Sequence, residues 1–78
     1  MTLEIITPEK KLYNGTVTSV KVPGTDGEFE ILNNHASIIS SLTKGNIRVI
    51  DDKQEESNFN INSGVIEMQK NKIVILAE

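Results

Sequence analysis

Residues 16–32 read TVTSVKVPGTDGEFEIL, which is two runs of mixed apolar and polar residues around a segment rich in turn formers. The first run is dense in β-branched side chains, which fit the half-buried surface of a sheet. In the second run, Phe29 and Ile31 alternate with Glu28 and Glu30, so an extended chain has one apolar and one acidic face. The stretch therefore predicts two neighbouring strands joined by a turn.

The same period of two recurs along the rest of the chain. Further apolar-polar runs occupy residues 3–6, 46–50, 58–62, 65–69 and 72–78, and Gly, Asn, Asp or Pro residues separate them. Short β-runs divided by frequent turn residues are typical of an all-β sandwich or barrel. Residues 36–42 (ASIISSL) fit a short helical turn or a strand, and their isoleucines and serines favour the strand. We expect one domain over residues 1–78, with no substantial helix.

Composition excludes several classes of function. The chain of 78 residues has no cysteine and one histidine, which removes disulfides, thiolate sites and multi-histidine metal sites. A net charge of −3 and 4% aromatic residues are poorly suited to nucleic acid, which needs basic patches and stacking rings. No apolar run approaches the roughly 20 residues that span a bilayer. We expect a soluble protein without a large enclosed pocket.

The acidic segment from Asp26 to Ser37 leaves three interpretations open. His35 could act as a general base oriented by Glu28 or Glu30, although no nucleophile in a triad arrangement accompanies it. The carboxylates resemble ligands for a hard cation, but the spacing of a calcium loop is absent. The third interpretation is a docking surface, whose carboxylates pair with lysine or arginine on a partner protein. On residue chemistry alone, a docking surface and ordinary solubilising charges explain these carboxylates equally well.

Four segments in order resemble one known family: LEIITPEKKLYNG, VTSVKVPGTDGEFEILNNHASIIS, LTKGNIRVI and NSGVIEMQKNKIVILAE. They are similar to the N-terminal domain of the ε subunit of the F-type ATP synthase. That family shows a PG..GEFGIL.NHAP pattern, then L..G.IRI, a glycine-rich turn and a closing VTVLAE. The similarity runs from residue 3 to residue 78. No single motif is decisive, and the ordered combination is specific.

The resemblance implies a flattened two-layer β-sandwich of about ten short strands. It implies a central-stalk subunit that links the γ subunit to the c-ring and helps couple proton translocation to ATP synthesis. Such a subunit has no catalytic residue, no metal and no cofactor. It binds to the membrane only through its complex, at the cytoplasmic face of the bacterial inner membrane. The alternative is a free-standing β-sandwich module that binds a ligand.

Residue by residue, the resemblance implies two sets of contacts. The loop expected to face the c-ring contains Gly27, Glu28, Glu30, Asn33 and Asn34, with Glu28 opposite an arginine-containing loop of the c subunits. The residues expected to face the γ subunit are Thr7, His35 and Ser40.

The chain departs from the family pattern at four places, one of which is Asn62-Ser63-Gly64 in place of the double glycine. Glu30 stands where the family has glycine, so a second carboxylate lies near Glu28. Asn33 and Ser37 stand where proline is common, and proline would have fixed φ in that loop. The chain ends at Glu78, where many family members continue into a helical hairpin. We expect no inhibitory hairpin and no regulatory ATP site here, and either a naturally short subunit or a shortened chain fits this ending.

Overall fold

The computed structural model describes residues 1–78, and they form eight β-strands and no helix. The strands are β1 (Thr2–Ile6), β2 (Lys11–Gly24), β3 (Gly27–Leu32), β4 (Ile38–Leu42), β5 (Gly45–Asp51), β6 (Glu56–Ile61), β7 (Gly64–Gln69) and β8 (Lys72–Ala77). The all-β prediction is confirmed, and the ambiguous residues 36–42 contain a strand. The structure has eight strands where about ten were expected, and one long strand, β2, covers 14 residues without a break. The structure has no helix that could cross a membrane.

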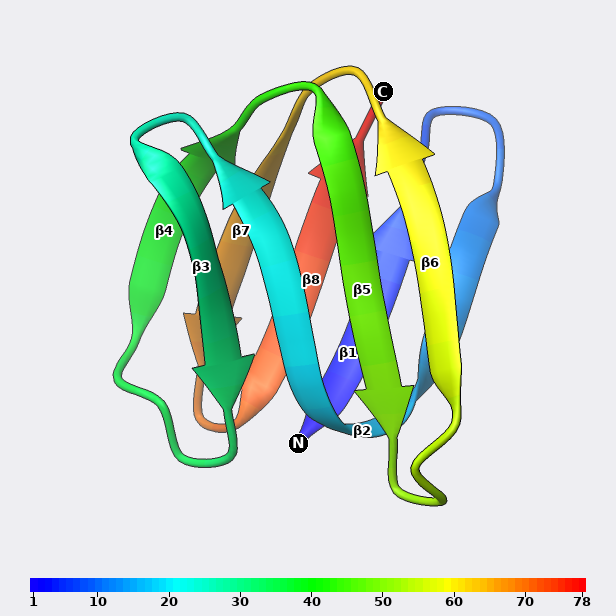
Figure 1. The fold of residues 1–78 in the computed structure, drawn as a ribbon, viewed down its shortest axis with the longest axis vertical. Helices are drawn as coiled ribbons and strands as arrows, with labels where there is room; N and C mark the ends of the chain where they lie inside the picture. Colours follow the sequence, from blue (N-terminus) through cyan, green and yellow to red (C-terminus); the bar gives the residue numbers. More distant parts are fainter.

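Strand β2 passes from one layer of the sandwich to the other (Figure 1). Its first half pairs with β1, and its second half pairs with β5 on one side and β3 on the other. One layer therefore contains β3, the end of β2, β5 and β6, and we call it the front layer (Figure 1). The back layer contains β4, β7, β8, β1 and the start of β2. All neighbours are antiparallel except β1 and β8, which run parallel.

The core lies between the two layers because every strand turns alternate side chains inward. Ile31, Ile47 and Val49 point inward from the front layer, and each is at most 1% exposed. Ile66 and Ile75 meet them from the back layer and are fully buried. These inward positions are the apolar members of the alternating runs in the sequence. The sandwich that results measures 27 × 24 × 17 Å, which is flat along one axis.

The turns gather at two opposite ends of the sandwich (Figure 1). The first end holds the β2–β3 turn, the β4–β5 turn, the β6–β7 turn, the β1–β2 loop and the C-terminus, and we call it the β2–β3 end. The opposite end holds the N-terminus, the β3–β4 loop, the β5–β6 turn and the β7–β8 turn, and we call it the β3–β4 end. A residue at the start of β3 and a residue just after β3 therefore lie at opposite ends.

Candidate functional site

The outer side of the front layer carries two ion pairs. Lys21 Nζ lies 3.1 Å from a carboxylate oxygen of Glu28, and Arg48 Nη2 lies 2.8 Å from Oε2 of Glu30. The buried Ser19 hydroxyl donates a 2.5 Å hydrogen bond to the same Oε2. Strand register explains the cluster, because Glu30, Lys21 and Arg48 lie opposite one another on β3, β2 and β5. Both carboxylates that the sequence singled out are thus partnered within the chain.

The β2–β3 turn sets the position of Glu28 and depends on two glycines. Gly24 and Gly27 are the last pair of the two strands. Gly27 has a φ of 129°, which favours glycine because side chains crowd the backbone there. A Cβ on Gly24 would lie 2.6 Å from the carbonyl oxygen of Gly27. The two glycines therefore allow the tight turn that presents Glu28 at the β2–β3 end.

The five residues expected in one ring-facing loop do not lie in one loop. Gly27, Glu28 and Glu30 belong to strand β3, while Asn33 and Asn34 follow it at the opposite end of the sandwich. The Asn33 side chain accepts a 2.8 Å hydrogen bond from the Met1 amino group. The Asn34 backbone N–H donates to the side-chain oxygen of Asn71, at 3.0 Å. The proposed set therefore divides into a β2–β3 part and a β3–β4 part, which lie at opposite ends of the sandwich.

The three residues expected to face the γ subunit are also separated. Thr7 lies in the β1–β2 loop, where its hydroxyl and the backbone of Lys10 bond to each other at 3.0 and 3.1 Å. His35 is exposed in the β3–β4 loop, and its Nδ1 lies 2.7 Å from the carbonyl oxygen of Ala36. Ser40 is half-buried in β4, with its hydroxyl on the carbonyl oxygen of Ser41. These contacts bring none of the three together.

The structure does not assemble the catalytic arrangement considered for His35. The His35 ring contacts a backbone carbonyl, whereas Glu28 and Glu30 pair with Lys21 and Arg48. No group of three or more histidine, aspartate or glutamate side chains converges as a metal site requires. The structure therefore gives no geometric support for His35 as a general base or for a cation site at these carboxylates.

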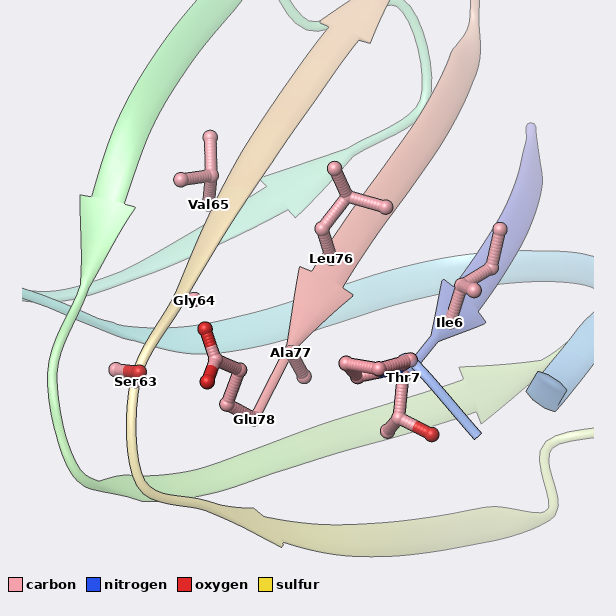
Figure 2. Close-up of a pocket in the computed structure, with 9 residues that line it drawn as sticks. Ile6, Thr7, Ser63, Gly64, Val65, Leu76, Ala77 and Glu78 are labelled. Carbon is pink, nitrogen blue, oxygen red and sulfur yellow. The ribbon is translucent and has the colours of Figure 1, made fainter. Parts of the chain in front are cut away.

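The back layer has an exposed apolar outer face that the sequence analysis did not identify. Ile6, Leu76 and Val65 occupy one cross-strand row over β1, β8 and β7, and they point to the same side (Figure 2). Leu76 is 55% exposed, and Ile39 on the neighbouring β4 is 74% exposed. We call Ile6, Ile39, Val65, Val74 and Leu76 the apolar face, and the exposed Glu67 lies within it, between Val74 and Ile39 in the strand register.

A shallow groove of about 490 Å³ runs along the apolar face at the β2–β3 end. Ile6, Val65 and Leu76 line it together with Thr7 and Glu78 (Figure 2). Backbone hydrogen bonds fix its rim, because Asn62 N–H donates to Glu78 (2.7 Å) and Glu78 N–H donates to Ser63 (3.0 Å). The groove is therefore an apolar feature on a fixed framework, and Thr7 is the one predicted γ-facing residue that borders it.

One sequence signal could have found this face. In residues 72–77 (KIVILA), Ile73 and Ile75 occupy one side of the strand and Val74 and Leu76 the other, and all four are apolar. A strand that is apolar on both sides is typical of burial on both sides. The core covers only the side of Ile73 and Ile75, so the other side lacks a partner in this chain.

A third ion pair borders the apolar face. Lys11 Nζ lies 2.7 Å from a carboxylate oxygen of Glu4, which neighbours Val74 across β1 and β8. The hydrogen bond from Lys11 lowers the pKa of Glu4 below its ordinary value, against a smaller opposing effect of desolvation. The charges of Lys11 and Lys72 add to the lowering. Glu4 is therefore an ionised carboxylate at the edge of this face at neutral pH.

Comparisons with known proteins agree with this architecture. The family model for the ATP synthase delta/epsilon chain, β-sandwich domain, matches residues 1–78. An ATP synthase epsilon chain from Chlorobium limicola is 43% identical over 77 residues, which cover 97% of this chain and 86% of that relative. An ATP synthase epsilon chain from Campylobacter concisus is also 43% identical, over 97% of this chain, but this chain spans only 59% of that relative.

A solved structure shows the same fold at lower sequence identity. The central stalk/c-ring structure of the Tetrahymena thermophila mitochondrial ATP synthase contains a chain that matches with a TM-score of 0.80. The match covers 99% of this chain and 62% of that chain, at 17% identity. At this identity the likeness concerns the fold.

Proposed function

Because the chain belongs to the β-sandwich family of ATP synthase delta/epsilon chains, we propose that it is a central-stalk subunit of an F-type ATP synthase. In this role it joins the γ subunit to the c-ring and helps couple proton translocation to ATP synthesis. It acts by binding and by rigidity, without a catalytic group of its own. Its place is at the cytoplasmic face of the bacterial inner membrane, where it is held through its complex.

Rigidity is what such a coupling piece requires, and the backbone supports it. Forty-nine backbone hydrogen bonds tie the eight strands and their turns together in a chain of 78 residues. Strand β2 belongs to both layers, so a force on one layer passes along a continuous strand to the other. The sandwich is thus suited to transmit a load between two partners.

The observation that carries the proposal is the contrast between the two outer faces. A stable interface takes about 800 Å² from each partner, and the chain has a total surface of 4750 Å². Two such interfaces need well-separated parts of so small a surface. The apolar face supplies one of them, because exposed apolar patches on a soluble domain mark binding sites. We assign this face to the γ subunit, with Thr7 at its border.

The second interface is the β2–β3 end, which presents Glu28 on the charged outer side of the front layer. The Glu28 side chain is 57% exposed, so a cation on a partner can reach it. We assign the front-layer side of this end, at the β2–β3 turn, to the c-ring, because Thr7 and the groove of the apolar face lie on the back-layer side. Asn33, Asn34 and His35 lie at the opposite end and cannot share that contact, so we drop the two asparagines from the ring-facing set. His35 is left as a separate candidate for a γ contact at the β3–β4 end.

A matched pair of leucines tests the assignment of the apolar face. Leu76 is 55% exposed on the apolar face, and Leu32 is 53% exposed on the front layer. Leu76→Asp and Leu32→Asp each add one negative charge at a similarly exposed leucine. When each variant is co-expressed with the γ subunit, Leu76→Asp should lose co-purification, and Leu32→Asp, whose carbonyl bonds the backbone of the separate candidate His35, should lose much less of it. Equal retention of γ by both variants would refute the assignment.

A further inference from the structure

Glu28 is already paired before any ring contact forms. Its partner, Lys21, lies 3.1 Å away on the neighbouring strand, and both side chains are well exposed, at 57% and 38%. An exposed pair of this kind is weak and is screened by salt. A cation on the c-ring that binds Glu28 must nevertheless replace Lys21 or share the carboxylate with it.

Glu30 offers Lys21 a second position. Lys21 lies directly opposite Glu30 in the strand register, whereas its present partner, Glu28, is diagonal. Both Ser19 and Arg48 contact Oε2 of Glu30, and no contact engages its Oε1. One oxygen of the Glu30 carboxylate is therefore held in place, and the other is open. Glu30 is also the carboxylate directly opposite Lys21 in the strand register.

We propose that Lys21 exchanges between two carboxylates when the subunit meets the c-ring. A ring cation takes Glu28, and the Lys21 ammonium moves to Oε1 of Glu30. This inference rests on the proposed contact between Glu28 and the ring. Lys21 thereby opposes ring binding, because it competes with the ring cation for Glu28. Glu30 reduces the free-energy cost of releasing Lys21, because it offers the ammonium a second carboxylate. The exchange gives Glu30 a role that the glycine of the family pattern could not fill.

Charge balance within the cluster supports this sequence of events. In the free chain, two carboxylates face two cations, Lys21 and Arg48. After the exchange, Glu28 has the ring cation and Glu30 has both Lys21 and Arg48, so no carboxylate or ammonium is left without an opposite charge. Without Glu30, the displaced Lys21 would lie next to Arg48, its cross-strand neighbour, with no carboxylate between them.

The test is a binding titration of the full chain onto ATP synthase complex from which this subunit has been removed. Four proteins are compared at low salt: the unchanged chain, Lys21→Gln, Glu30→Gln and the double variant. Lys21→Gln should bind more tightly by up to about fivefold, which is the upper range for an exposed ion pair. Glu30→Gln should bind less tightly while Lys21 is present and should have no effect once Lys21 is replaced. Both effects should disappear at high salt.

Two controls separate this inference from its premise. Lys53→Gln makes the same charge change at the exposed β5–β6 turn, at the other end of the front layer, and should leave the binding constant unchanged. Glu28→Gln should weaken binding, and if it does not, the ring contact itself is refuted. If Glu28→Gln weakens binding but Lys21→Gln does not tighten it, the exchange is refuted and the contact stands. An equal effect of Glu30→Gln with and without Lys21 would also refute the exchange.

Discussion

Glu30 on β3 reaches across β2 to Arg48 on β5, with 2.8 Å between the carboxylate oxygen and the guanidinium nitrogen. Strand β3 pairs with no other strand than β2, so this contact ties an outer strand to the middle of the front layer. The same carboxylate also accepts the hydroxyl of Ser19, which is 6% exposed. Glu30, which stands where the family pattern has glycine, therefore helps to hold β3 to the rest of the front layer.

Replacement of Glu30 by glycine should destabilise the chain by about 1–2 kcal/mol. Glycine inside a strand costs about 0.5–1 kcal/mol, an exposed ion pair contributes at most about 1, and the Ser19 hydroxyl loses its acceptor. Glu67→Gly is the matched control, because Glu67 is exposed in β7 and has no ion pair. Urea unfolding should show the smaller loss for Glu67→Gly. Equal losses would mean that Arg48 and Ser19 add nothing through Glu30.

Neighbouring residues of β8 should respond in opposite ways to truncation. Ile75 is fully buried, so Ile75→Ala should lower the free energy of unfolding by about 2–5 kcal/mol. Leu76 points outward, so Leu76→Ala should change it by no more than about 0.5 kcal/mol. Thermal or urea unfolding of the isolated chain measures both. A large loss in Leu76→Ala would show that this side chain stabilises the fold and is not reserved for a partner.

The β2–β3 turn should not tolerate a methyl group at Gly24. An added Cβ would lie 2.6 Å from the carbonyl oxygen of Gly27 and 2.7 Å from the ring of Phe29. Gly24→Ala should therefore cost about 1–3 kcal/mol, as overpacking does elsewhere. Gly15→Ala is the comparison, because its new Cβ would come no closer than 3.4 Å to any atom, that atom being in Tyr13. Comparable unfolding curves for the two variants would contradict the close packing of this turn.

The Glu4–Lys11 pair should make part of the stability depend on pH. The pKa of Glu4 is lowered in the folded chain, chiefly by the hydrogen bond from Lys11. A lowered folded pKa stabilises the chain above the unfolded pKa, and this contribution disappears as the pH falls through the folded value. The unchanged chain should therefore exceed Glu4→Gln in stability near neutral pH, and the gap should close in acid. NMR titration should show that the Glu4 pKa rises in Lys11→Gln, because the largest cause of its lowering is removed.

The strands and the core were predictable because both follow from the period of two. Phe29 and Ile31 alternate with two glutamates, and a sheet buries one side of such a strand whatever its neighbours are. The contacts between Glu30 and Arg48 were not predictable, because 18 residues separate them and only strand register brings them together. Asn33 was misplaced for a related reason. It is only five residues from Glu28 in the sequence, but strand β3 carries it to the opposite end of the sandwich.

The apolar face needed the structure for a different reason. Val65, Leu76 and Ile6 come from three separate segments, and each alone is an unremarkable outward side chain. Only the pairing of β7, β8 and β1 aligns them in one row. The apolar character of both sides of β8 was visible in the sequence, but which side lacked a partner was not.

Disulfide crosslinking from position 28 tests the central claim most directly. Glu28→Cys in the assembled ATP synthase should crosslink to a cysteine placed in the polar loop of a c subunit. Glu56→Cys is the control, because Glu56 is an exposed glutamate at the other end of the same layer. The account predicts a crosslink from position 28 and none from position 56. A crosslink from position 56 alone, in an active complex, would contradict the placement of the β2–β3 end on the c-ring.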